Sequence, residues 1–139
     1  ELLIEAFKNL GQPGLHLVVI GDVSDKDIAY KRQLLDKANG ASNIHWTGWL
    51  TSREIYPYLD MADIAVFPAS QSILWQQAIS MGLPLIVGDT RHQDISYLNT
   101  HSNIIILRRD QINASVIEAS LREMVEDISL RERMAQGAR

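Results

Sequence analysis

Short apolar runs alternate with helical patterns along the whole chain, and this alternation restricts the possible folds more than any other feature. The candidate strands lie at residues 15–20, 44–47, 63–68, 84–88 and 103–107. Predicted helices surround them at residues 2–10, 25–39, 73–81, 94–98, 113–127 and 130–138, and another begins after Thr51 or Ser52, where Glu54 can close a capping box. The pattern predicts an α/β fold: a Rossmann-like, doubly wound parallel sheet with helices on both faces. We expect the first strand to be buried on both of its faces.

The amino-acid composition further limits which classes of protein the chain can belong to. The 139 residues suit one domain spanning 1–139, and 46% hydrophobic with 22% charged residues argues against disorder. The absence of cysteine excludes disulfides, thiolate zinc sites and cysteine nucleophiles. A net charge of −4 without a Lys/Arg block argues against nucleic-acid binding. No apolar run reaches the ~20 residues that span a bilayer, so we expect a cytoplasmic domain.

Both ends of the sequence are typical of a piece of a longer protein. Glu1 is not a start methionine, and no capping residue precedes the first helical pattern. The last pattern remains helical up to Arg139. We therefore expect residues 1–139 to be one domain of a larger protein.

The residues that follow the first two strands are candidate ligand contacts, because parallel sheets bind ligands at the carboxyl ends of their strands. Gly21 and Asp22 follow the first strand without a dinucleotide or P-loop glycine pattern, so a tight turn is an equal alternative. Gly48 and Trp49 follow the second strand, where glycine allows close approach and the indole offers a stacking face. The alternative is that Trp49 covers the core.

The third strand leads directly into a helix, whose free N–H groups and dipole favour anions. Ser70 and Ser72 lie on this connection, and Ser72 either caps the helix, the commoner role, or contacts a phosphate. Gln76 and Gln77 follow one turn later and can hydrogen-bond sugar hydroxyls, although they also fit solvated helix positions.

No pattern in the chain predicts a metal or a nucleophile. Residues 89–92 after the fourth strand are more typical of a polar loop than of a substrate site. Metal-ligand spacing is absent among His16, His45, His92 and His101. No nucleophile-elbow pattern occurs either. From its residues alone, the sequence predicts an anion-binding α/β domain but no reaction.

Six segments occur in a characteristic order: LIEAF at 3–7, LVVIGD at 17–22, NIHWTGWL at 43–50, MADIAVFP at 61–68, SMGLPLI at 80–86 and LRERM at 130–134. In this order they resemble the C-terminal, donor-binding domain of GT-B fold glycosyltransferases, particularly glycosyltransferase family 4. Together they cover almost the whole chain.

The resemblance implies one half of a GT-B fold, which binds a UDP- or GDP-sugar over the strand ends and faces an N-terminal acceptor-binding domain. The base would lie beside Gly48, Trp49 and Leu50. The diphosphate would meet backbone amides of Ser72, Ile73 and Leu74. No cofactor, metal or catalytic residue is implied in this chain, because the acceptor-side residues of the family belong to the other domain.

The sequence departs from the family at two glutamates, which are eight residues apart in most members. The second, on the ribose, corresponds to Gln77, or to Gln76 if the helix register shifts, and the first corresponds to Ala69. Glutamine can still bind a diol, but its neutral hydrogen bonds are weaker than those of a carboxylate by roughly a factor of two. No Lys or Arg of this chain can be assigned to the diphosphate.

Three functions follow from the resemblance. We favour the donor-binding half of a hexosyltransferase, expected to be retaining and to act in polysaccharide or glycan biosynthesis. A non-catalytic interaction module is the second hypothesis, because Ala69 and Gln77 replace both acids. A sugar-nucleotide epimerase of the same fold is the third. Any peripheral contact with the inner face of a membrane is assigned to the acceptor domain, and the isolated chain is expected to be inactive.

Overall fold

The computed structural model describes residues 1–69, 72–91 and 94–138, and it confirms the predicted α/β class. The elements in chain order are α1 (Leu2–Leu10), β1 (Leu17–Ile20), η1 (Asp25–Asp27), α2 (Ile28–Ala38), β2 (Ile44–Gly48), α3 (Ser52–Met61), β3 (Ala65–Phe67), α4 (Leu74–Ser80), β4 (Leu85–Gly88), η2 (Ser96–Leu98), β5 (Ile104–Leu107), η3 (Arg109–Gln111), α5 (Ala114–Glu126) and α6 (Ile128–Ala138). All three of the strand pairings between these elements are parallel.

The described strands form two sheets instead of the single sheet that we predicted. β1 pairs with β2, and β3, β4 and β5 pair in that order, while β1 and β3 share no ladder. Every residue of β1 is consequently only half-buried, so the expectation that this strand is buried on both faces is wrong. β4, the central strand of its sheet, is buried along its whole length.

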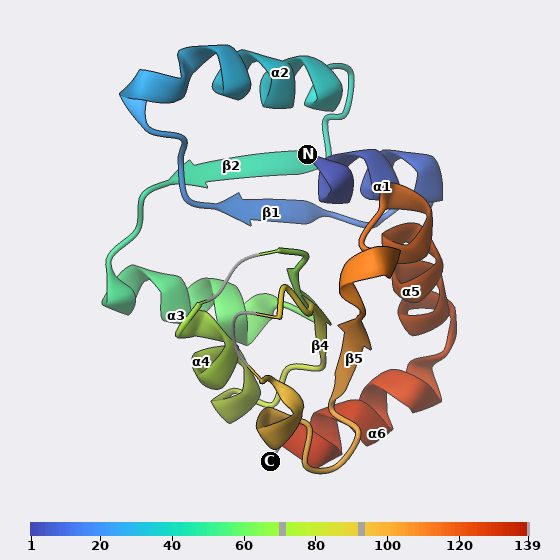
Figure 1. Cartoon of the computed structure of the whole chain (residues 1–139). Helices are drawn as coiled ribbons and strands as arrows, with labels where there is room; N and C mark the ends of the chain where they lie inside the picture. Colours follow the sequence, from blue (N-terminus) through green and yellow to red (C-terminus); the bar gives the residue numbers. More distant parts are fainter. Residues whose placement is uncertain (70–71, 92–93, 139) are drawn as a thin grey trace.

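Two hydrophobic clusters cover the two faces of the larger sheet. Side chains alternate in direction along β4: Leu85 and Val87 join a cluster with α3 and α4, and Ile86 joins a second cluster with α5 and α6. Figure 1 shows α3 and α4 on one side of β4 and β5, with α5 and α6 on the other. The helices therefore lie on both faces of this sheet, as predicted.

Helix α1 connects the two sheets. Its Ala6 and Leu10 belong to the cluster of α5 and α6, while Ile4 and Phe7 belong to a third cluster with α2 and the strands β1 and β2. Gly11, in the left-handed region at φ 58°, ends α1. The smaller sheet is therefore held against the rest of the domain by both faces of one short helix.

The predicted capping box is present at the start of α3. The Glu54 carboxylate accepts hydrogen bonds from the backbone N–H and the hydroxyl of Thr51, at 2.8 and 2.7 Å. These two donors hold the pKa of the Glu54 carboxyl below its usual value, because they stabilise its charged form. The capping box thereby fixes the start of α3, which follows the end of β2 after a short connection.

Candidate functional site

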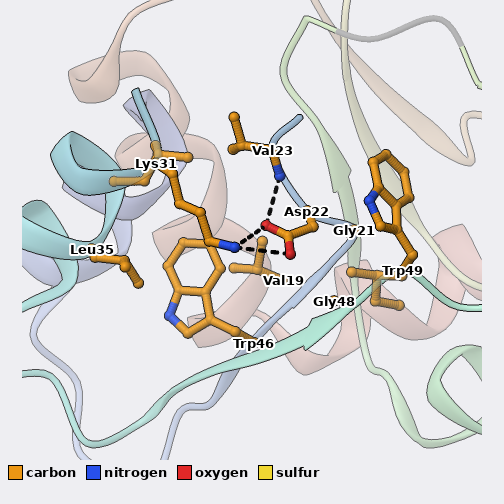
Figure 2. A pocket seen from close by; sticks show the side chains of 11 residues that line it. Val19, Gly21, Asp22, Val23, Lys31, Leu35, Trp46, Gly48 and Trp49 are labelled. Carbon is orange, nitrogen blue, oxygen red and sulfur yellow. Dashed lines mark hydrogen bonds and ion pairs between the residues drawn. The ribbon is translucent and has the colours of Figure 1, made fainter. Parts of the chain in front are cut away.

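A cavity of about 350 Å³ lies at the carboxyl ends of β1 and β2, beside α2 (Figure 2). It is lined by Val19, Ile20, Gly21, Asp22, Val23, Lys31, Leu34, Leu35, Trp46, Gly48 and Trp49. Four residues that the sequence singled out, Gly21, Asp22, Gly48 and Trp49, therefore come together in one site.

Two glycines join the ends of the strands at this cavity. The backbone N–H of Gly21 donates to the carbonyl of Gly48 at 2.9 Å. Their φ angles are 116° and 70°, a region that side-chain-bearing residues rarely adopt. A Cβ atom on Gly48 would have no neighbour within 4 Å, so open space adjoins the backbone there. A ligand can therefore approach this backbone closely without a steric clash.

Two tryptophans supply aromatic surface to the cavity. Trp49 is 76% exposed, so the alternative that it covers the core is wrong. Trp46 is 39% exposed, and Figure 2 shows the two indoles on opposite sides of Asp22. An exposed indole next to accessible glycine backbone can stack on a planar ligand.

An ion pair forms the polar part of the cavity. The Lys31 ammonium lies 2.7 Å from Oδ1 and 2.9 Å from Oδ2 of Asp22, and Oδ1 also accepts the N–H of Val23 at 2.7 Å. Lys31 and, secondly, the Val23 N–H hold the pKa of the Asp22 carboxyl below its usual value. The side chains remain 45% and 33% exposed, so solvent and ligands reach both groups.

The residues predicted on α4 do not line this cavity. Ser72 lies just before α4, and its hydroxyl accepts the N–H of Leu74, the first residue of the helix, at 3.1 Å, while its contact with a phosphate stays a prediction. Ile73 is 73% exposed just before the helix, which has seven residues. Leu50, although next to Trp49, packs against the cluster of α3 and α4. Ser70 lies outside the described residues.

The two glutamines of α4 have different surroundings. Gln76 is exposed and its Nε2 donates to the Tyr97 hydroxyl at 3.4 Å, which agrees with a solvated helix position. Gln77 is half-buried, and its Oε1 is buried without a hydrogen-bond partner among the described residues. The solvated interpretation is therefore wrong for Gln77. Ala69 is exposed and has no polar side-chain atom.

The sequence interpretation missed two polar or aromatic residues of the cavity, Lys31 and Trp46. Trp46 precedes Gly48 by two positions on β2, and alternation along the strand could have placed both on one face. Lys31 comes from α2, and no local pattern relates it to Asp22, since only the packing of α2 brings them together.

Residues 1–69, 72–91 and 94–138 contain neither a metal-ligand cluster nor a membrane-spanning helix. In these ranges no three His, Cys, Asp or Glu side chains gather as metal ligands. Over the same ranges, no helix is long and apolar enough to cross a membrane.

Parallel strands with helices on both faces of the larger sheet define an α/β domain, and the solved structures that it resembles are Rossmann-like domains of GT-B glycosyltransferases. The C-terminal domain of LpcC, a glycosyl transferase group 1 family protein from Francisella tularensis, is similar with a TM-score of 0.83 and 21% identity over 99% of this chain and 73% of that one. WaaG, a glycosyltransferase involved in lipopolysaccharide biosynthesis, gives 0.76 and 20% over 99% and 37%. A protein assigned as a UDP-N-acetylglucosamine 2-epimerase from Listeria monocytogenes gives 0.78 and 14% over 98% and 35%.

The sequence profile of the family Glycosyl transferases group 1 matches residues 1–126, and the chain belongs to this family. The suspected resemblance to the donor domain of GT-B glycosyltransferases is thus confirmed at the level of family and fold. A comparison with curated proteins gave no match. The chain spans 35% and 37% of the length of the Listeria protein and of WaaG.

Proposed function

We propose that this chain is the donor-binding domain of a glycosyltransferase, which transfers a sugar from a UDP- or GDP-sugar to an acceptor hydroxyl in polysaccharide or glycan biosynthesis. The observation that carries the proposal is the family match over residues 1–126. The gathering of Gly21, Asp22, Gly48 and Trp49 around one cavity at the strand ends supports it, because open α/β sheets bind ligands at this edge.

Each part of the donor has a proposed place. The base stacks on Trp49 and approaches the open backbone of Gly48. The diphosphate extends toward the backbone amides before and within the first turn of α4, at 72–74, where a helix N-terminus favours negative charge. Leu50, anchored in the core, fixes the backbone that carries Trp49. The ribose is expected to meet Gln77, or Gln76 if the helix register shifts, at the position of the second family glutamate.

The contribution of this domain to the reaction is electrostatic and geometric. In the transfer, the bond between the anomeric carbon and the diphosphate oxygen breaks as the acceptor oxygen bonds to that carbon, and the proton of the acceptor hydroxyl passes to the departing diphosphate. Hydrogen-bond donors that stabilise the departing diphosphate lower the barrier, and the acceptor domain positions the hydroxyl. We propose retention at the anomeric carbon, no activity of this chain alone, a cytoplasmic location, and contact with the inner face of a membrane only through the acceptor domain.

Calorimetric titration with UDP, GDP and their sugars tests the proposal. We expect at least one of these nucleotides to bind at micromolar to millimolar concentration, and Trp49→Ala to weaken binding roughly tenfold, a typical stacking contribution. Tyr56→Ala is the matched control, because Tyr56 is also an exposed aromatic, at 43%, but does not line the cavity. Failure of every nucleotide to bind at millimolar concentration would contradict the proposal.

The second candidate, a non-catalytic interaction module, is favoured by one observation. Ala69 has no polar side chain, and the Gln77 Oε1 is buried, so neither position of the two family acids presents an accessible acceptor to a sugar. Donor hydrolysis or transfer by the protein that contains both domains, abolished by Gln77→Ala, would exclude this candidate. Interconversion of UDP-sugar epimers without an acceptor would instead favour an epimerase, the activity in the name of the Listeria protein.

A further inference from the structure

The cavity at the ends of β1 and β2 has one charged region, in which an acid and a base lie together. Among the described residues that line the cavity, Asp22 and Lys31 are the charged side chains. The other lining residues are aliphatic, aromatic or glycine. In a mostly apolar site, the few polar groups decide which ligand fits. A planar base that enters this cavity therefore meets a carboxylate and an ammonium side by side.

This ion pair is close to the indole on which a base can stack. A Cβ atom on Gly21, the residue directly before Asp22, would lie 4.0 Å from Cζ3 of Trp49. Figure 2 shows the Asp22 carboxylate between the Lys31 ammonium and the Trp49 indole. The edge of a base that lies on this indole can consequently reach Asp22 and Lys31.

Guanine and uracil present different hydrogen-bonding edges to such a pair. Guanine has the acceptor O6, the donor N1–H and the donor N2 amino group in a row, whereas uracil has one donor, N3–H, between the carbonyls O2 and O4. An ionised carboxylate only accepts hydrogen bonds, and an ammonium only donates them. The carboxylate thus matches two neighbouring donors of guanine and the ammonium matches O6. On uracil the carboxylate would face two carbonyl oxygens, which repel it.

We propose that Asp22 and Lys31 read the base of the donor and select a guanine nucleotide over a uracil nucleotide. Asp22 accepts from N1–H and the N2 amino group, and Lys31 donates to O6. This assignment rests on the proposed function, which places the base in the cavity, and it narrows the donor class to a GDP-sugar. It involves the base alone and holds wherever the diphosphate binds.

The local contacts suit both residues to this role. Oδ1 of Asp22 accepts the N–H of Val23 at 2.7 Å, which holds the carboxylate in place. Lys31 and, secondly, Val23 hold the pKa of the Asp22 carboxyl below its usual value, so the carboxylate is ionised at neutral pH. The Lys31 ammonium, 2.7 and 2.9 Å from the two oxygens, has three hydrogens on a flexible stem. Because the Lys31 and Asp22 side chains are 45% and 33% exposed, their pairing contributes little to stability, and the ammonium can turn toward O6.

Calorimetric titration of the wild-type chain with GDP, inosine diphosphate and UDP tests the selection without any substitution. Inosine diphosphate carries guanine without its N2 amino group, and the three ligands share the same diphosphate. We expect GDP to bind roughly tenfold more tightly than inosine diphosphate, for one hydrogen bond to a charged acceptor. GDP should also bind more tightly than UDP.

Three variants, each shown to be folded by circular dichroism, assign the roles. Asp22→Asn replaces one acceptor by a donor, so GDP and inosine diphosphate should bind within about twofold of each other, and UDP should gain relative to GDP. Lys31→Met removes the donor to O6, so it should weaken GDP and inosine diphosphate alike, and more than UDP. Asp36→Asn is the matched control, because Asp36 is exposed on α2 and outside the cavity lining. It makes the same change in charge and should leave the ratios of the three affinities unchanged.

Each result separates the base selection from the proposed function. Equal binding of GDP and inosine diphosphate, or tighter binding of UDP, by the wild-type chain overturns the selection of guanine and leaves the proposed function intact. A preference for GDP over inosine diphosphate that persists in Asp22→Asn overturns the role of Asp22. Equal weakening of all three ligands by Lys31→Met overturns the role of Lys31. If no nucleotide binds, the proposed function itself is contradicted.

Discussion

Gly88, the last residue of β4, is the position where we expect one added methyl group to do the most damage. It is buried, and its φ lies outside the left-handed region, so the backbone itself would accept alanine. A Cβ atom at this position would lie 1.7 Å from the Pro68 carbonyl oxygen, 2.6 Å from the Pro68 carbonyl carbon and 2.9 Å from Cδ1 of Ile112. Pro68 follows β3, on the chain that leads to α4.

The size of the effect follows from what must move. Where the backbone accepts it, a change from glycine to alanine stabilises a protein by about 0.4–1 kcal/mol through the unfolded state. Overpacking a core costs typically about 1–3 kcal/mol, and here the obstacle is backbone that cannot rotate away. We therefore expect Gly88→Ala to lower the free energy of unfolding by about 3 kcal/mol, instead of raising it as a change from glycine to alanine otherwise does.

Urea unfolding, followed by tryptophan fluorescence and circular dichroism, measures this free energy. Gly14→Ala is the control, because Gly14 has a φ of 83° but no atom within 4 Å of its Cβ position. The Gly14→Ala variant should be destabilised only by the strain of a left-handed alanine, which costs about 1–2 kcal/mol. A Gly88→Ala variant as stable as the wild type would show that the end of β4 and the segment after β3 are not packed as described.

Three further predictions concern stability. Met124→Ala, at a fully buried position, should destabilise the chain by about 2–5 kcal/mol, whereas Met61→Ala, at a position 63% exposed, should stay within about 0.5 kcal/mol of the wild type in urea unfolding. Asn113→Ala removes the N-cap of α5, whose side-chain amide oxygen accepts a backbone N–H of that helix. We expect the free energy of unfolding, from the same measurement, to fall by about 1 kcal/mol. Glu54→Gln should lower the thermal midpoint more at pH 7 than at pH 3. Folding lowers the pKa of Glu54, so its stabilising effect is present above the unfolded pKa and is lost as the pH falls through the folded pKa. Equal effects of Glu54→Gln at both pH values would contradict that reasoning.

The sequence predicted the elements well where a local signal marks them. The bounds of α1 were correct, because an amphipathic pattern ends at Gly11, and the capping box of Thr51 and Glu54 was recognised from its spacing. Several strands were predicted too long at their ends. The separation into two sheets was not predictable from periodicity, because apolar runs do not show which strands exchange hydrogen bonds.

The candidate site was predictable only in part, for a related reason. Gly21, Asp22, Gly48 and Trp49 follow strand ends, and parallel topology brings strand ends together. The Lys31 side chain reaches the same cavity from a helix, which depends on how α2 packs. The residues at the start of α4 and on it were predicted from the connection after the third strand and from the resemblance to the family, and those that the structure describes lie outside the lining of the cavity.

The binding of a nucleotide at the cavity is tested most directly by the indole N–H signals of the three tryptophans in a ¹⁵N NMR titration with UDP and GDP. Trp46 and Trp49 line the cavity, whereas Trp75 is 5% exposed in the core and serves as an internal control. We predict that the signals of Trp46 and Trp49 shift with a common saturation curve and that the Trp75 signal stays in place. No shift at millimolar nucleotide, or equal shifts of all three signals, would contradict a donor site in this cavity.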